Sequence, residues 1–249
     1  MPSLAFDRVA HCYDETRGGD ERGRVVAARV EGGLVPDGLT LEVGVGTGVV
    51  AAALRARGRA VVGVDLSPAM LARARARLGP LVAVADAHAL PVAPAAVDNV
   101  CVVWVLHAVA DVAVVIRECG RVLRGGGRLV VASGRPRPGD DDLSLVDAPL
   151  TALRPGEDDR DTIVGHARDS GLAVVEITEL TTEFDQSPAE LVRRIERRVF
   201  AFLWDVDDVT WASVIAPVID GLRRLPEPDR PRHRVQCQDL LVFERSAAG

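Results

Sequence analysis

The chain of 249 residues has few cysteines, few aromatic side chains and no uninterrupted apolar run long enough to cross a membrane. Its four cysteines are scattered, with no C-x-x-C pair and no histidine at a partnering distance, which argues against a zinc site or a disulfide framework. The amino-terminal residues lack the basic-then-apolar layout of a signal peptide. A net charge of −6 argues against nucleic acid as the main partner. We therefore expect a soluble, cytoplasmic protein that holds no metal and binds neither nucleic acid nor a membrane.

The most informative stretch is a glycine-rich turn between a predicted strand and a predicted helix. An aliphatic run up to Val45 is interrupted by Gly44, Gly46 and Gly48, and an Ala-rich helical run follows from Val49. Glycine suits such a turn because the backbone visits positive φ and because a ligand can approach it without meeting a Cβ atom. The first amides of the helix have no partner within the helix and point at whatever lies over the turn. The pattern predicts a ligand cradle.

Two residues bear on which ligand the cradle holds. Val49 stands where the dinucleotide fingerprint has its third glycine, which here comes early, at Gly48. Glu42 precedes the turn, and a carboxylate there repels a pyrophosphate but suits a positively charged ligand. The spacing E-x-G-x-G-x-G resembles motif I of the class I S-adenosylmethionine (SAM)-dependent methyltransferases, whose ligand carries an ammonium and a sulfonium. The turn alone leaves a dinucleotide site or a purely structural turn open.

Acidic residues end the next two predicted strands. Asp65 stands 21 residues beyond Gly44, where a carboxylate accepts hydrogen bonds from ribose hydroxyls in both NAD and SAM proteins. We assign it to the cofactor with its neighbour Leu66, since Ser67 already suits the N-cap of the following helix. The loop after the third strand resembles the adenine-contacting loop of small-molecule methyltransferases. That resemblance implies that Asp86 accepts from the adenine amino group and that Ala87 leaves room for the ring.

Three further segments strengthen the resemblance. Residues 98–107 resemble the family's fourth strand, and residues 121–131 resemble its R-V-L-x-P-G-G-x-L segment, with Arg-Gly where Lys/Arg-Pro is usual. Trp104 and His107, near the carboxyl end of that strand, are assigned to the cofactor pocket, and His107 is also the first candidate for a general base. Residues 13–17 resemble the Y-D-x-x-R segment whose tyrosine and arginine cover the cofactor and approach its carboxylate. This assigns Tyr13 and Arg17 to the cofactor, against the alternative that Arg17 pairs with a neighbouring acid at the surface.

Strands that are apolar throughout alternate with helices along the chain, which predicts a parallel sheet covered on both faces. The resemblance implies a doubly wound, Rossmann-like α/β fold of seven strands in the order 3-2-1-4-5-7-6, with the last strand antiparallel. We expect one domain over residues 1–249. Its predicted parts are an N-terminal helical cover (1–33), a SAM-binding core (40–132), a long loop (133–156) and a helical lid insertion before the last strand (187–230).

The insertion holds four of the nine aromatic residues. A helix is predicted from Ser187 through Trp204, which makes Phe200 and Trp204 neighbours four residues apart, suited either to a substrate-binding wall or to helix packing. The acidic run Asp140–Asp142 is interpreted as solvated loop, because a hard cation needs several converging oxygens.

The predicted function is transfer of a methyl group from SAM to an O, N or C nucleophile of a small molecule, a secondary metabolite or a quinone-like precursor, with S-adenosylhomocysteine as product. The sulfonium is already activated, so the protein mainly supplies alignment and exclusion of water, and a base is optional. The alternatives are a SAM-binding protein that does not methylate and a nicotinamide-dependent oxidoreductase, which Glu42 and Val49 disfavour. The sequence leaves monomer and homodimer equally open.

Overall fold

The computed structural model describes residues 6–137, 139–153 and 158–247. The chain divides into two compact units: unit 1 comprises Met1–Gly134, Glu157–Leu180 and Gln238–Gly249, and unit 2 comprises Arg135–Gly156 and Thr181–Cys237. Strands β5 (Leu123–Arg137), β6 (Leu172–Gln186) and β7 (Arg232–Arg245) contribute residues to both units. None of the helices in the described ranges is long and apolar enough to cross a membrane.

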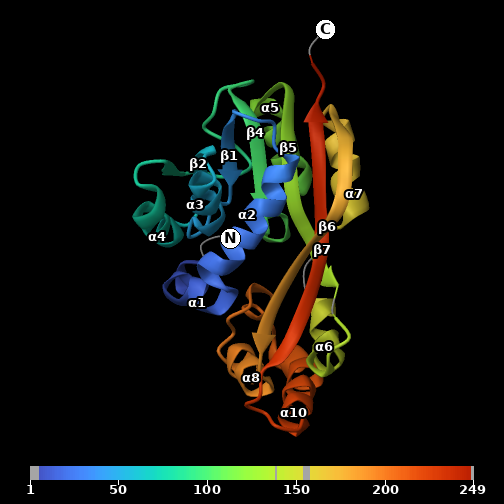
Figure 1. The fold of residues 1–249 in the computed structure, drawn as a ribbon. Helices are drawn as coiled ribbons and strands as arrows, with labels where there is room; N and C mark the ends of the chain where they lie inside the picture. Colours follow the sequence, from blue (N-terminus) through green and yellow to red (C-terminus); the bar gives the residue numbers. More distant parts are fainter. Residues whose placement is uncertain (1–5, 138, 154–157, 248–249) are drawn as a thin grey trace. The chain divides into compact units, whose positions relative to one another are not determined.

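A seven-stranded sheet organises the fold, in the order β3-β2-β1-β4-β5-β7-β6 (Figure 1). The first four strands are β1 (Leu39–Val43), β2 (Ala60–Asp65), β3 (Val82–Val84) and β4 (Val97–Val103). Pairing is parallel between β1 and β2, β2 and β3, β1 and β4, and β4 and β5. In Figure 1 the arrow of β7 points opposite to that of β6. The predicted doubly wound α/β fold and its strand order are therefore confirmed.

Helices cover both faces of the sheet in unit 1, each face with its own buried apolar cluster. These helices are α1 (Tyr13–Arg17), α2 (Gly19–Gly33), α3 (Val49–Ala56), α4 (Pro68–Leu78), α5 (Val112–Val122) and α7 (Arg160–Asp169). Leu129 and Val131 of β5 join the cluster with α5 and α7, while Val130 joins the cluster with α2, α3 and α4. Successive strand residues point to opposite faces, so a strand apolar throughout is buried on both sides.

The predicted helix starts are confirmed. Ser67 Oγ accepts a hydrogen bond from the Met70 amide at 3.1 Å. Ser187 Oγ accepts from the Glu190 amide at 3.2 Å at the start of α8 (Pro188–Glu196). In both helices a proline follows the cap, where its missing N–H costs no hydrogen bond.

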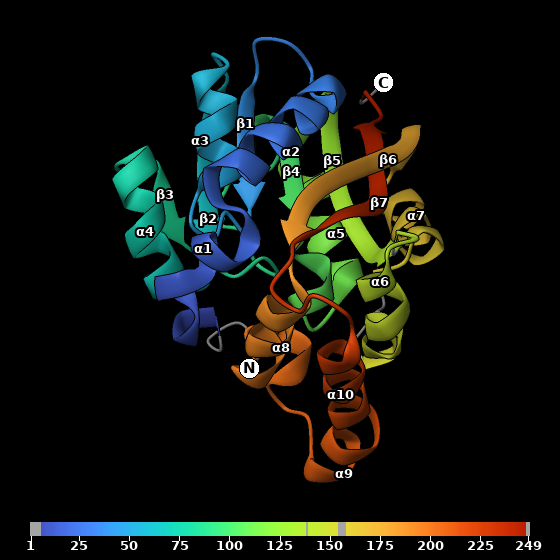
Figure 2. The same cartoon turned by 60° about the horizontal axis from the view of Figure 1, so that its bottom comes forward.

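Unit 2 has an apolar cluster of its own, formed mainly by helices. Its other elements are α6 (Asp142–Asp147), η4 (Ala148–Leu153), η5 (Ala201–Leu203), α9 (Asp208–Thr210), η6 (Trp211–Ile215) and α10 (Ala216–Arg224). Figure 2 shows α10 between α6 and α8, and side chains of all three belong to the cluster. The π-helical turn η6 ends just before Pro217, which has no N–H to continue a regular helix.

The long loop predicted over residues 133–156 is wrong where the structure describes it. Strand β5 continues to Arg137, and α6 and η4 occupy most of the remainder. Asp141 accepts from the Ser144 amide at 3.0 Å and thereby caps α6, while Leu143 and Leu150 are buried in the unit 2 cluster. The polar composition of the segment reflects a helix cap and not a loop. Residues 138 and 154–156 lie outside the described ranges.

The helix predicted to continue from Ser187 to Trp204 is also shorter than expected. It ends at Glu196, and Arg198 has φ +49°, a left-handed conformation that a right-handed helix cannot include. Phe200 stacks instead on Phe202, with ring centroids 5.5 Å apart, and Trp204 Nε1 donates to the Arg198 carbonyl at 2.8 Å. The predicted packing of Phe200 and Trp204 as neighbours on one helix is therefore wrong.

Candidate functional site

The glycine turn after β1 has the backbone that the sequence predicts. Gly44, Gly46 and Gly48 have φ of 73°, 55° and 81°. A Cβ atom on Gly44 would lie 2.3 Å from a methyl group of Val105, and one on Gly48 would lie 3.0 Å from Leu78. A Cβ atom on Gly46 would have no atom within 4 Å. Packing explains two of the glycines, and Gly46 is the one at which a ligand can approach bare backbone.

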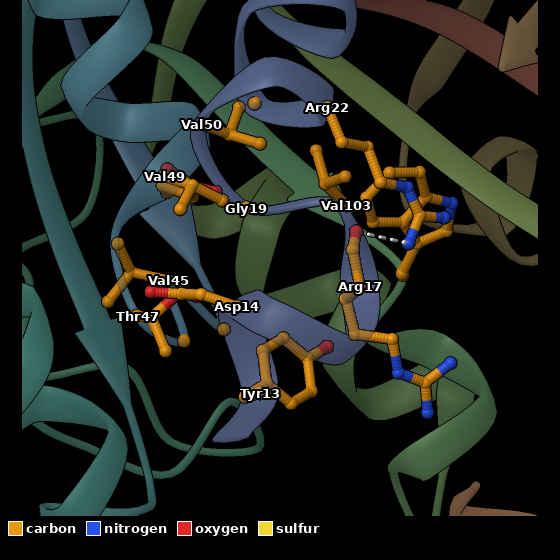
Figure 3. A pocket seen from close by; sticks show the side chains of 15 residues that line it. Tyr13, Asp14, Arg17, Gly19, Arg22, Val45, Thr47, Val49, Val50 and Val103 are labelled. Carbon is orange, nitrogen blue, oxygen red and sulfur yellow. Dashed lines mark hydrogen bonds between the residues drawn. The ribbon is translucent and has the colours of Figure 1, made fainter. Parts of the chain in front are cut away.

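A pocket lies over this turn. It is bordered by the turn itself, by the first residues of α3, by α1 and α2, and by the end of β4 (Figure 3). Six of the predicted cofactor residues line it: Tyr13, Arg17, Glu42, Gly44, Gly46 and Trp104. The structure therefore brings together residues from three separate predicted motifs around one cavity, at the carboxyl edge of the sheet where ligands bind in folds of this class.

Glu42 is the most unusual residue of the pocket. It is 2% exposed, and its Oε2 atom has no hydrogen-bond partner among the described residues. Burial raises the pKa of its carboxyl from 4.5 to about 8, although a hydrogen bond from the Ala51 amide opposes the shift and the nearby Asp65 adds to it. A buried carboxyl with an unsatisfied oxygen beside a cavity is suited to receive a cationic group.

Asp65 lies next to the pocket and supports the turn. Its carboxylate accepts from the Gly46 amide and from the Ser67 amide, each at 2.8 Å. Burial raises its pKa, and these amide hydrogen bonds oppose the shift. Leu66, half-buried, follows it directly. Asp65 therefore holds the turn in place, whatever contact its carboxylate makes with a ligand.

A polar network that the sequence did not predict ties α1 to the glycine turn. Asp14 Oδ1 accepts from the Thr47 hydroxyl at 2.5 Å, and Asp14 Oδ2 lies 2.8 Å from Arg77. Arg77 also donates to the Thr47 carbonyl at 3.0 Å and pairs with Asp20 at 3.0 Å. In the sequence analysis Asp14 enters only through the alternative in which Arg17 pairs with a neighbouring acid, Asp14 or Glu15, at the surface. Since Asp14 and Thr47 line the pocket, the network fixes the helical cover over it (Figure 3).

Helix α2 approaches the pocket through two glycines whose role the sequence analysis missed. Gly19 and Gly23 line the pocket, and a Cβ atom on Gly23 would lie 2.7 Å from the Val49 carbonyl oxygen. The side chain of Arg22, between them, lines the pocket as well. Two glycines four residues apart within the predicted helical cover were the available signal, because glycine weakens a helix unless close packing requires it.

The predicted adenine-binding residues lie elsewhere in unit 1. Asp86 Oδ1 accepts from the amide of His88 at 2.9 Å and contacts its ring Nδ1 at 2.6 Å, and these hydrogen bonds lower the pKa of Asp86. His88 Nε2 in turn accepts from the Asp111 amide at 3.3 Å, which indicates that Nδ1 carries the proton. His88 thus orients Asp86. Ala87 is half-buried against the core of unit 1.

The remaining predicted residues do not border this pocket. His107 is half-buried in a short 3₁₀ turn, η3 (Leu106–Ala108), three residues after Trp104. Phe200 and Trp204 belong to unit 2. Among the described residues, no group of three or more histidine, cysteine, aspartate or glutamate side chains could hold a metal ion.

Comparison with known proteins gives a consistent result. Residues 41–131 match the model of a family described as "Methyltransferase domain". A demethylmenaquinone methyltransferase of Mycolicibacterium paratuberculosis is 39% identical over 130 residues, which cover 51% of this chain and 56% of that protein. The chain thus matches little more than half the length of this relative.

Solved structures extend the likeness in fold. A SAM-dependent methyltransferase from Thermotoga maritima superposes with a TM-score of 0.60 at 18% identity, covering 99% of this chain and 100% of that one. The [4+2]-cyclase SpnF superposes with a TM-score of 0.61 at 18% identity, covering 99% and 96%. Residues 41–131 are thus similar to a methyltransferase domain, and the strand order and the glycine turn agree with that similarity.

Proposed function

We propose that this protein binds SAM in the pocket of unit 1 and transfers its methyl group to a small-molecule acceptor, releasing S-adenosylhomocysteine. The observation that carries the proposal is Glu42, a buried carboxyl in the wall of the pocket with one oxygen unpartnered among the described residues. A dinucleotide would bring a pyrophosphate, which the ionised form of this carboxyl repels, whereas SAM brings positive charge, which favours that ionised form. The relative named as a demethylmenaquinone methyltransferase supports the same class of reaction.

The proposed roles follow from the chemistry of each side chain. SAM, when bound, supplies a methyl group activated by the sulfonium. Glu42 offsets positive charge of the ligand, and the bare backbone of Gly46 lets the ligand approach the turn. Tyr13 and Arg17, whose guanidinium lies 5.7 Å from the tyrosine ring centroid, cover the cofactor and bind its carboxylate.

Other residues receive the nucleoside and the acceptor in this proposal. Asp65 and Asp86 accept hydrogen bonds from ribose and adenine, with Leu66 and Ala87 beside them. His107 would accept a proton from an acceptor whose nucleophile carries one. Phe200 and Trp204 are proposed to contact the acceptor from the helical insertion at 187–230, which would act as the lid.

Calorimetric titration with SAM, S-adenosylhomocysteine and NADH tests the cofactor. We expect the first two to bind and NADH to be silent. Gly46→Ala should weaken SAM binding at least tenfold, because its methyl group would occupy the open side of the turn. The matched control is Gly171→Ala, which also has positive φ (+74°) and open surroundings but does not line the pocket. Asp65→Ala is a less specific test, because the Asp65 carboxylate holds the Gly46 amide.

Binding of NADH with no response to SAM would contradict the proposal. The transfer itself is tested with SAM labelled in its methyl group and demethylmenaquinone as the first acceptor, the labelled quinone being the expected product. The second candidate function is that of a SAM-binding protein that does not methylate. We retain it because a [4+2]-cyclase has the same fold. That candidate predicts SAM binding without transfer to any member of an acceptor panel.

A further inference from the structure

Trp104, in the wall of the pocket, has a strained backbone. It follows the last residue of β4 and has φ +57°, a left-handed conformation that is rare for a residue with a bulky side chain. Its amide donates to the Ala132 carbonyl at 2.9 Å, so the strand pairing continues up to this residue. Strained residues persist where the surroundings hold them, and they gather at ligand sites.

Two side chains hold the indole of Trp104. Its Nε1 donates to Gln238 Oε1 at 2.6 Å, and Gln238, on β7, is 7% exposed. The Arg22 guanidinium lies 3.6 Å from the centroid of the indole and also donates to the Arg17 carbonyl at 3.4 Å. The edge of the indole is therefore fixed by a buried amide and one face by a cation–π contact.

The position of the indole links it to the cofactor cradle. In the parallel register, Val102 of β4 pairs with Val43 of β1, so Trp104 follows β4 where the glycine turn follows β1. Trp104, Arg22 and Glu42 all line the same pocket, but Gln238 does not. Gln238 therefore reaches the pocket through Trp104.

We propose that Gln238 is a positioning residue of the cofactor pocket: by accepting the indole hydrogen bond it holds Trp104 in its left-handed conformation as the pocket wall. This inference rests on the proposed function for its effect on SAM. If the side-chain oxygen of Gln238 were removed, or displaced by one hydrogen-bond length, the indole edge would be released. The strained backbone of Trp104 would then relax toward an ordinary conformation.

Fluorescence reports the orientation of Trp104 independently of any ligand. The chain has three tryptophans, so Trp204→Phe with Trp211→Phe leaves Trp104 as the single reporter. In that background Gln238→Leu, similar in size but without an acceptor, should shift the emission to longer wavelength and increase quenching by acrylamide. Gln238→Glu keeps an acceptor oxygen and should restore the original emission. Thermal unfolding of each variant establishes that it is folded.

The affinity for SAM then tests the role in the pocket. Gln238→Leu should weaken SAM binding about tenfold, and Gln238→Glu should retain it within about threefold. Trp104→Phe removes the same hydrogen bond from the donor side, so adding Gln238→Leu to Trp104→Phe should cause no further loss. An equal loss from Gln238→Leu in both backgrounds, or altered fluorescence with unchanged affinity, would overturn the positioning role. Absence of SAM binding in the unsubstituted protein would instead overturn the proposed function.

Discussion

Glu42 is the most deeply buried side chain of a charged type in unit 1 and Arg234 is its counterpart in unit 2, and their surroundings differ. Arg234 in unit 2 is 3% exposed and lies 2.9 Å from Gln186 Oε1, 2.9 Å from the Ser144 hydroxyl and 3.0 Å from Asp147 Oδ2, with Asp141 at 3.3 Å. Glu42 in unit 1 is equally buried, yet one of its oxygens has no partner in the described part of the chain.

The difference separates a structural charge from a binding charge. Burying an ionised group is costly unless hydrogen bonds and opposite charges surround it. Arg234 has two carboxylates, an amide oxygen and a hydroxyl beside it within its own unit, although its Nε, 3.3 Å from Asp141 Oδ1, makes no hydrogen bond among the described residues. Glu42 has a hydrogen bond from the Ala51 amide, but its Oε2 has none in the described part of the chain, and burial raises its pKa to about 8, so that it is mostly neutral at pH 7. A cationic ligand would supply the missing partner, and this is why we assign the binding role to Glu42 and a structural role to Arg234.

The largest expected effect comes from removing the structural charge. Arg234→Met leaves Asp141 and Asp147 without their buried partner, which should cost about 3–5 kcal/mol of unfolding free energy. Urea denaturation measures this loss, and calorimetry at a temperature where the variant is folded should show unchanged SAM affinity. Arg223→Met, which removes an exposed pair with Glu196, is the control and should cost about 1 kcal/mol or less. If Arg234→Met were as stable as the unsubstituted protein, the structural role assigned to Arg234 would be wrong, and so would its contrast with Glu42.

Neutralising the binding charge should have the opposite effect on stability. The folded-state pKa of Glu42 lies above its ordinary value, so its contribution to stability is fully present below about pH 4.5 and is lost as the pH rises through about 8. Glu42→Gln removes that loss and should stabilise the protein at pH 8.5 by about 2–4 kcal/mol, less than the full shift implies because the new amide N–H₂ also needs acceptors. Unfolding at pH 5 and pH 8.5 measures the difference. Equal stability changes at both pH values would show that Glu42 is not the titrating group.

The sequence predicted those features that depend on residues close together in the chain. The turn at Gly44, Gly46 and Gly48 and the caps at Ser67 and Ser187 are local patterns whose backbone requirements are known, and all are confirmed. The strand order followed from the family resemblance carried by residues 40–132, and it is confirmed as well.

Features that depend on distant partners were missed. Asp14 meets Thr47 and Arg77, 33 and 63 residues away, and nothing in a chain with 30 basic and 36 acidic residues singles out that pairing. The left-handed turn that ends the helix before Phe200 occurs at Arg198, which is not a glycine, so the sequence gives no sign of it. The assignments of Asp86, His107, Phe200 and Trp204 to ligands stay predictions, because they rest on resemblance.

A smaller effect tests how closely the helical cover must approach the cradle. Gly23→Ala places a methyl group 2.7 Å from the Val49 carbonyl oxygen at the start of α3, and overpacking of this kind costs about 1–3 kcal/mol. Gly32→Ala is the matched control on the same helix, because a Cβ atom there has no atom within 4 Å, and it should be neutral or stabilising by up to about 1 kcal/mol. Thermal unfolding and SAM titration of both variants measure the difference. If both lose SAM affinity equally, the close contact of α2 with α3 is not what shapes the pocket.

The smallest effect is a pH dependence of SAM binding, and it addresses Glu42 directly. Because its pKa in the free protein is about 8, only a small fraction of Glu42 is ionised below pH 7, and that fraction rises about tenfold for each pH unit. If the positively charged ligand selects the ionised carboxyl, affinity should rise about tenfold from pH 6 to pH 7, with about one proton released per SAM bound. Calorimetry in two buffers of different ionisation enthalpy counts that proton. Glu42→Gln should bind more weakly, with a flat profile and no proton release. If the affinity of Glu42→Gln for SAM rose by the same factor between pH 6 and pH 7, the released proton would belong to another group. Binding of a cationic ligand would then not explain why Glu42 is buried.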